Sequence, residues 1–113
     1  MNMVYVLLGT GFEEIEALTP VDLLRRAGVE VKTVGLNGKI VYGGHAIGVE
    51  ADLTIEELDA SDAEMIVLPG GLGGVASIKA CEKALDAASH AVACSTLCAG
   101  IFLCAYDRSG AGI

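Results

Sequence analysis

The stretch Ala63-Glu64-Met65-Ile66-Val67-Leu68-Pro69-Gly70-Gly71 decides the fold of this chain. Its four consecutive apolar residues, followed by Pro-Gly-Gly, are typical of a fully buried strand that ends in a sharp turn. Such strands lie in parallel sheets whose two faces are covered by helices. Because ligands of open α/β sheets bind at the carboxyl ends of the strands, the backbone N–H groups of Gly70 and Gly71 are candidate ligand contacts.

The segments on either side of this strand alternate between strand and helix patterns. Strands are predicted at 3–8, 29–36 and 65–68, a hairpin at 40–42 with 47–50, and helices at 12–26, 54–57 and 75–88, followed by another strand and helix. Thr19 resembles an N-cap with Pro20 at the first helical position, so we expect the first helix to be kinked or re-initiated there. The order predicts an α/β doubly wound parallel sheet in which 65–68 is central, beside 3–8.

Composition narrows the class of protein. The chain has 113 residues, 53% hydrophobic and 19% charged, which indicates a single globular domain over residues 1–113. Its 7 basic and 15 acidic residues give a net charge of −8, which argues against nucleic acid or an anionic membrane as partner. The sequence shows no secretory signal and no apolar run long enough to span a membrane. In such a chain the four cysteines are expected to be reduced thiols, which predicts a cytoplasmic setting.

The acidic residues after the first strand have different expected roles. Gly9-Thr10-Gly11 would begin a dinucleotide fingerprint, but Glu14 stands where its third glycine belongs, and the neighbouring carboxylates would repel a pyrophosphate. We therefore expect no nucleotide cofactor. Glu13 and Glu14 are expected to face water at the helix start. Glu16 lies further along the helix, where it is expected to project over the sheet end, partly desolvated, and to stay protonated as a hydrogen-bond donor.

Cys98 is the candidate nucleophile among the four cysteines. It is predicted to end a strand, with small residues after it and a helix following, as in a nucleophile elbow whose helix N-terminus favours the thiolate. The other three are expected to be ordinary small apolar residues, namely Cys81, Cys94 and Cys104. The two histidines, His45 in the hairpin and His90 after a helix, have no metal-ligand spacing with the cysteines, so we expect no metal site.

Three motifs in order, at residues 11–16, 20–28 and 67–71, make the chain resemble the ThiJ/PfpI superfamily, and within it the DJ-one-like branch of deglycase and stress-response proteins. The resemblance covers about residues 1–88. It implies a flavodoxin-like α/β sandwich of the class I glutamine amidotransferase type, usually dimeric. It also implies a site made of an elbow cysteine, a glutamate of the first helix, and N–H groups of the Pro-Gly-Gly turn. Carried over, these are Cys98, Glu16, Gly70 and Gly71.

The resemblance fades after Ser89. Ser95-Thr96 interrupts the expected aliphatic strand, and Ile101 stands where the family has a proline. The spacing from the Pro-Gly-Gly turn is slightly short to Cys98 and slightly long to Cys104, which leaves both as candidates for the elbow. The sequence stops at Ile113, before the last third of the family fold, so we expect a truncated domain.

A reading-frame change is one hypothesis for this departure. Residues 104–112 can be back-translated so that a neighbouring frame reads Ala-Pro-Thr-Ile-Ala-Ala-Gly-Leu-Gly, which is similar to the family helix after the nucleophile. The nucleotide sequence of the gene would test it.

The resemblance implies a cysteine-dependent deglycase or glyoxalase that acts on reactive α-oxoaldehydes, or on their early adducts with amines or thiols. In that function Glu16 would shuttle a proton and Gly70 with Gly71 would stabilise an oxyanion. The alternatives are a redox-sensing stress-response protein or chaperone with an oxidisable cysteine, and an inactive truncated fragment. A homodimer is the expected assembly.

Overall fold

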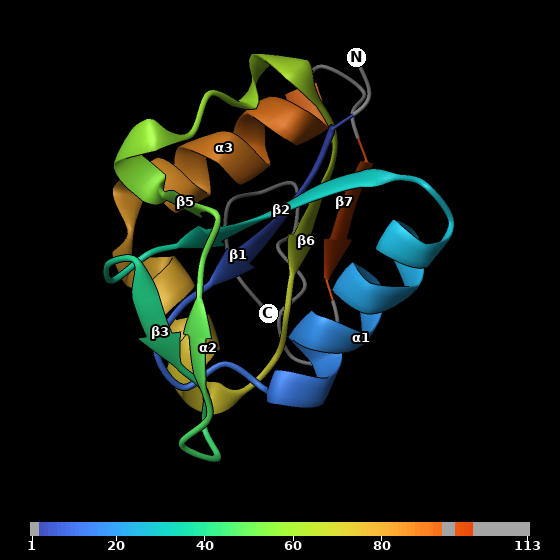
Figure 1. Ribbon diagram of the computed structural model, residues 1–113. Helices are drawn as coiled ribbons and strands as arrows, with labels where there is room; N and C mark the ends of the chain where they lie inside the picture. Colours follow the sequence, from blue (N-terminus) through green and yellow to red (C-terminus); the bar gives the residue numbers. More distant parts are fainter. Residues whose placement is uncertain (1–2, 94–96, 101–113) are drawn as a thin grey trace.

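The computed structural model describes residues 3–93 and 97–100, with side chains through Ser89 (Figure 1). Its elements are β1 (Met3–Leu8), α1 (Glu14–Arg26), β2 (Glu30–Gly35), β3 (Ile40–Tyr42), β4 (Gly48–Glu50), β5 (Leu53–Thr54), the 3-10 helices η1 (Ile55–Glu57) and η2 (Ala60–Asp62), β6 (Ala63–Leu68), α2 (Leu72–Ala80), α3 (Glu82–Ala93) and β7 (Leu97–Gly100).

The main sheet has five described strands in the order β5-β2-β1-β6-β7, all parallel. The antiparallel pair β3–β4 forms a separate small sheet. Figure 1 shows α1 on one face of the main sheet and α3 on the other. The predicted α/β doubly wound architecture is therefore confirmed. β6 lies between β1 and β7, as expected for an interior strand, although β1 is the middle one of the five.

Burial on both faces explains why β1 is apolar throughout. All six of its residues are buried. Leu7 belongs to the same core cluster as Ala84 of α3, whereas Leu8 belongs to the cluster that contains Ala17 of α1. Because successive side chains of a strand point to opposite faces, a strand covered on both sides favours apolar residues at every position. Small alanines on the helices let them approach the sheet closely.

Two local predictions are confirmed. The hairpin is formed by β3 and β4, with Ile40 opposite Glu50 and Tyr42 opposite Gly48. A capping box opens η1, where the Thr54 N–H donates to Glu57 Oε1 at 2.9 Å. Within the part of the chain that the structure describes, no helix is long and apolar enough to cross a membrane.

The prediction for α1 was wrong at Pro20. The helix runs unbroken from Glu14 to Arg26, so Thr19 is an interior helical residue and not an N-cap. Proline removes one N–H hydrogen bond from a helix. Here Ala17 and Val21, on either side of Pro20, are both buried against the sheet, and this packing holds the two parts of the helix in line.

The helix predicted at 75–88 is in fact two helices. Cys81 has extended backbone angles, φ −101° and ψ 106°, and separates α2 from α3. Its N–H donates to the Ile78 carbonyl, and its own carbonyl accepts from the Leu85 N–H. Cys81 therefore closes one helix and opens the next, a change of direction that the apolar periodicity of the sequence does not reveal.

Backbone contact between two glycine-rich turns joins the first half of the domain to the second. Gly71, after β6, has φ +96°, and a Cβ there would lie 2.7 Å from the Gly11 carbonyl oxygen. A Cβ on Gly74 would lie 2.7 Å from Phe12 Cα. The Glu13 N–H also donates to the Gly70 carbonyl at 3.0 Å. Side chains are thus excluded between the β1–α1 turn and the β6–α2 turn.

Substituting Gly71 with alanine, compared with the same change at Gly28, separates the cost of losing this contact from the cost of a left-handed backbone conformation. Gly28 has φ +81° with nothing within 4 Å of an added Cβ, so Gly28→Ala measures the left-handed conformation by itself. We expect Gly28→Ala to cost about 1–2 kcal/mol of unfolding free energy, and Gly71→Ala about 3–4 kcal/mol, because overlap with the Gly11 carbonyl is added. Urea denaturation measures both. Equal losses would show that the turns do not need their close approach.

Candidate functional site

The candidate site lies at the carboxyl ends of β1 and β6, where the first turn of α1 meets the Pro-Gly-Gly turn. The Gly70 N–H donates to Glu16 Oε1 at 2.9 Å. The Gly70 carbonyl accepts from the Glu13 N–H at 3.0 Å. The glycine is therefore bound to α1 on both sides, and the half-buried Glu16 lies where the sequence placed it, over the end of the sheet.

The observed hydrogen bond uses one oxygen of the Glu16 carboxyl group. Glu16 Oε1 accepts from the Gly70 N–H, and the expected donor role of a protonated Glu16 stays a prediction. The Gly70 N–H, predicted as an oxyanion donor, is therefore occupied by the Glu16 carboxyl group. An oxyanion at this position would have to take over that N–H from Glu16.

Cys98 does not end its strand. It is the second residue of β7 and pairs with Ile66, while Gly100 pairs with Leu68 at the end of β6. β7 thus continues two residues past Cys98, about 7 Å at the usual rise of a parallel strand. The predicted strand end was wrong, and the role of Cys98 stays a prediction. Cys94 and Cys104 lie outside the described residues, and Cys81 is half-buried between α2 and α3.

Glu14 is a buried, hydrogen-bonded acid that was not predicted from the sequence. Expected to face water, it is only 5% exposed. Its Oε2 accepts from the His45 N–H at 2.8 Å and from the Ile47 N–H at 3.4 Å, and its Oε1 lies 2.9 Å from His45 Nδ1. The signal in the sequence is Gly43, since a Cβ at that position would overlap the Glu14 carboxyl group.

The charges of this pair stabilise each other. Burial of the Glu14 carboxyl group favours its neutral form, but hydrogen bonds from the His45 ring and from backbone N–H groups outweigh it and lower the pKa to about 2. The hydrogen bond to Glu14, and then the negative charge of Glu13, raise the pKa of His45 above its usual value of 6.5. The His45 side chain is 68% exposed, as expected from its place in a hairpin.

The same residues form the one possible metal-ligand set among residues 3–89. Donor atoms of Glu13, Glu14 and His45 all lie within 4.8 Å of one another, and His45 Nδ1 is 3.8 Å from Glu13 Oε1. Imidazole with two carboxylates suits a divalent transition metal. Both oxygens of Glu14 already accept hydrogen bonds, however, so an ion would have to displace the proton between Glu14 and His45.

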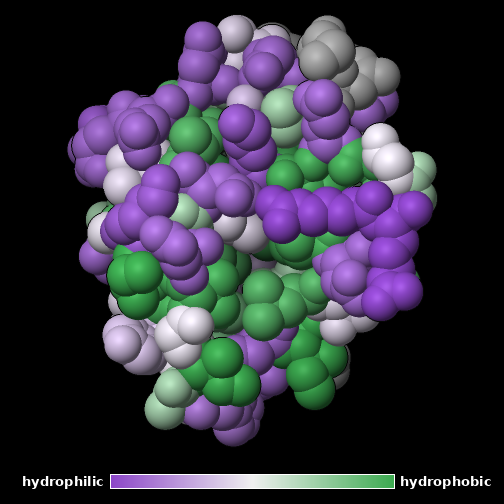
Figure 2. Space-filling view, viewed as in Figure 1, coloured by the Kyte–Doolittle hydropathy of each residue, from purple (hydrophilic) through white to green (hydrophobic). Residues whose placement is uncertain are grey.

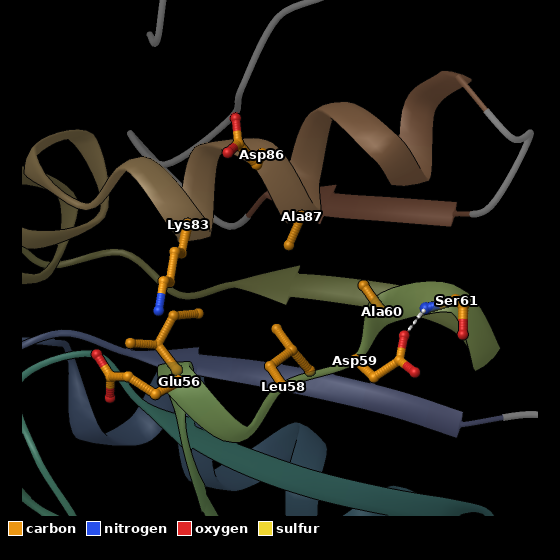
Figure 3. Close-up of a pocket in the computed structure, with 9 residues that line it drawn as sticks. Glu56, Leu58, Asp59, Ala60, Ser61, Lys83, Asp86 and Ala87 are labelled. Carbon is orange, nitrogen blue, oxygen red and sulfur yellow. Dashed lines mark hydrogen bonds between the residues drawn. The ribbon is translucent and has the colours of Figure 1, made fainter.

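A separate cavity of about 400 Å³ lies between the η1–η2 segment and α3 (Figure 3). Charged groups of Glu56, Asp59, Lys83 and Asp86 surround an apolar floor that includes Leu58. The Asp59 side chain accepts from the Ser61 N–H at 3.0 Å. The residues that line this cavity include none of Glu16, Gly70 and Gly71, so it is separate from the candidate site.

Comparison with known proteins identifies the class of protein. The model of the DJ-1/PfpI family matches residues 2–106, and the chain therefore belongs to the DJ-1/PfpI family. Protein dj-1beta of Drosophila melanogaster is 39% identical over 70 residues, covering 61% of this chain and 37% of that protein. A deglycase of Thermococcus kodakarensis is 32% identical over 68 residues, covering 60% of this chain and 41% of its own length.

Solved structures agree with this assignment. A DJ-1 superfamily protein from Salmonella typhimurium superimposes with a TM-score of 0.83 at 33% identity, covering 88% of this chain and 55% of that one. The chain thus spans about half of that structure, and about two fifths of the two curated relatives named above. The flavodoxin-like fold expected from the resemblance is confirmed.

The bond between Glu16 and Gly70 can be tested without an activity assay. Glu16→Ala removes the acceptor of a half-buried N–H group, so we expect a loss of about 1–2 kcal/mol in unfolding free energy and faster amide exchange at Gly70. Glu16→Gln keeps an oxygen acceptor and should lose less than half as much. Glu13→Ala is the matched control, because its bond to Gly70 comes from the backbone. Equal Gly70 exchange in Glu16→Ala and Glu13→Ala would contradict the assignment.

Proposed function

We propose that this chain carries the site of a cysteine-dependent deglycase or glyoxalase that acts on α-oxoaldehydes or their early adducts with amines or thiols. The observation that carries the proposal is the hydrogen bond of Glu16 to Gly70, made beside the strand that bears Cys98. Membership of the family and similarity to relatives named deglycases support it. The complete reaction is proposed for a chain that spans only part of those relatives.

The proposed reaction needs a cysteine thiol as well as Glu16 and the Pro-Gly-Gly turn. A cysteine thiolate would attack the aldehyde carbon, forming a C–S bond as the carbonyl electrons move to oxygen. The oxyanion would then compete with Glu16 for the Gly70 N–H, with Gly71 beside it. Glu16, released from that bond, would carry a proton between the adduct and water. Oxyanion stabilisation by the turn and proton transfer by Glu16 are thus linked, because both depend on the Gly70 N–H.

Two cysteines compete for the role of nucleophile. Cys98 is the predicted one, and it lies on β7 two residues before Gly100. Cys104 follows Gly100 by four residues along the chain. Since the elbow of this family lies after a strand, both thiols are tested together.

Activity should depend on Glu16 and on a single cysteine. We expect Glu16→Gln to lower formation of lactate from methylglyoxal by about 100-fold or more, as for loss of a general acid–base. We expect one of Cys98→Ser and Cys104→Ser, not both, to abolish it, with Cys81→Ser unchanged as control. Activity that survives both cysteine variants would refute a thiol mechanism. Loss with Cys104→Ser alone would place the elbow beyond β7.

An oxidation sensor is the second candidate function. A solved relative, DJ-1 of Toxoplasma gondii, is described as oxidized, and it superimposes with a TM-score of 0.83 at 29% identity. Under this alternative, mild peroxide would convert one thiolate to a sulfinate. A protein without lactate production in which one cysteine gains two oxygen atoms, seen by mass spectrometry, would favour the sensor over the enzyme.

We also propose a homodimer, formed through the exposed apolar surface of α1 and the hairpin. Ile15 is 72% exposed, Leu23 58% and Ile47 51%, and they line one groove of about 430 Å³. Figure 2 shows hydrophobic surface gathered in the lower half of the molecule, over the hairpin and the beginning of α1. A second copy would cover such a surface with its own equivalent face.

A charged residue introduced into the groove of α1 and the hairpin should prevent the homodimer from forming. We expect Leu23→Asp to convert a dimer to a monomer in analytical ultracentrifugation, because an unpaired carboxylate would be buried at the interface. Leu72→Asp is the matched control, since Leu72 is 81% exposed and does not line the groove. A wild-type protein that sediments as a monomer would refute the proposal.

A further inference from the structure

The turn between β2 and β3 contains an exposed asparagine followed by glycine, Asn37-Gly38. Gly38 has φ +123°, a conformation that favours glycine, and a Cβ added there would meet nothing within 4 Å. Because glycine has no side chain, the backbone nitrogen of Gly38 is not shielded from the Asn37 side chain that precedes it. The turn therefore places an open backbone nitrogen next to a carboxamide.

Thr10, at the end of β1, holds the Asn37 side chain by its oxygen. The Thr10 N–H donates to Asn37 Oδ1 at 2.9 Å, and the Thr10 hydroxyl donates to the same oxygen at 3.1 Å. Donors aimed at one carbonyl oxygen stabilise negative charge that develops there, as in an oxyanion hole. Both bonds use Oδ1, and Asn37 Nδ2 has no partner among the described residues.

The backbone of the turn is attached on both sides of the Asn-Gly pair. Before it, the Leu36 N–H donates to the Leu8 carbonyl at 2.9 Å. After it, the Lys39 carbonyl accepts from the Ala51 N–H at 2.7 Å. Between these two attachments, the Gly38 N–H donates to no described residue. The nitrogen can therefore lose its proton without breaking a hydrogen bond of the fold.

We propose that Asn37 is a site of spontaneous deamidation, in which the Gly38 nitrogen is the nucleophile and Thr10 stabilises the oxyanion. Hydroxide removes the Gly38 N–H proton, and the nitrogen forms a bond to Asn37 Cγ as the carbonyl electrons move to Oδ1. When these electrons return, the Cγ–Nδ2 bond breaks, and Nδ2 takes a proton from water and leaves as ammonia. The resulting succinimide ring is opened by water at either carbonyl, which gives aspartate or isoaspartate. The modification is independent of the proposed function.

The two products differ in how they hold Thr10. Aspartate at position 37 keeps an oxygen in the place of Oδ1, so both hydrogen bonds from Thr10 remain and now have a charged acceptor. Isoaspartate carries the main chain through Cγ, which lengthens the backbone by a methylene group and moves the carboxylate, so both bonds are lost. Because Thr10 precedes Gly11 of the β1–α1 turn, isoaspartate removes one attachment of the turn that contacts the Pro-Gly-Gly turn.

Incubation of the full chain in mildly alkaline buffer, followed by peptide mapping with mass spectrometry, tests the proposal. We expect the peptide that contains Asn37 to convert to two products in which –OH replaces –NH₂, separable by chromatography. Asn2, the only other asparagine, precedes methionine and is the internal control, which should stay unchanged over the same time. We expect Thr10→Ala to slow the conversion about tenfold, the factor for loss of one hydrogen bond to a developing charge. Thr10→Ser keeps the hydroxyl and should react at the rate of the wild type.

Two results would overturn the proposal. One is an Asn37 that stays unchanged in the folded chain while it converts in the same chain unfolded by urea, which would show that the turn protects the side chain. The other is a Thr10→Ala variant that converts as fast as the wild type or faster, which would remove Thr10 from the reaction. Circular dichroism before incubation checks that each variant is folded. If Thr10→Ala is not, Thr10→Val, which keeps the branched shape without the hydroxyl, takes its place.

Discussion

The structure depends on two turns that touch through their backbones. The β1–α1 turn and the β6–α2 turn meet where Gly11 and Phe12 lie against Gly71 and Gly74, at distances that leave no room for a Cβ. Neighbouring parallel strands place their following turns side by side at the same sheet edge, but side chains normally keep such turns apart. Removing those side chains brings the start of α1 within hydrogen-bond distance of Gly70, and this contact creates the candidate site.

The first turn of α1 then distributes its glutamates in different directions. Residues of a helix are rotated by about 100° from one to the next, so Glu14 and Glu16, two positions apart, point in different directions. Glu16 turns to the Gly70 N–H, and Glu14 turns to the hairpin. Glu13 adds charge beside His45 and bonds Gly70 through its backbone. Residues 13–16 thus bind the start of α1 to two places, the end of the main sheet and the hairpin.

Much of the fold was predictable because its strands are strongly patterned. β1 and residues 65–68 of β6 are apolar runs followed by glycine turns, and such runs have few alternatives to a buried parallel strand. The errors arose where tertiary packing overrides a local signal. Proline at position 20 predicted a break that burial on both sides prevents, and Cys81 ends a helix without a glycine or proline to mark it. Capping residues, glycine and proline predict the ends of a helix only where tertiary packing does not override them.

The site was harder to predict than the fold for the same reason. Gly70 was predicted from its place after a buried strand and Glu16 from its place in the first helix, the family motifs pointed to the same two residues, and the structure brings them together. Glu14 was assigned to solvent because a first-turn acid is usually exposed, and only the hairpin, 31 residues away in sequence, buries it. Long-range partners of a charged residue are not encoded in its neighbours. Gly43 was the one local indication, and its meaning requires knowing what lies beneath it.

Register is the remaining constraint on the chemistry. In a parallel sheet, the residue that reaches the active edge is determined by how many residues separate it from the neighbouring strand's end. β6 and β7 end together at Leu68 and Gly100, so a shift of one residue in the register of β7 would move a thiol on that strand by about 3.3 Å relative to Gly70. Cys98 lies two positions before Gly100, so its distance from the sheet edge follows from this register and not from the side chains around it.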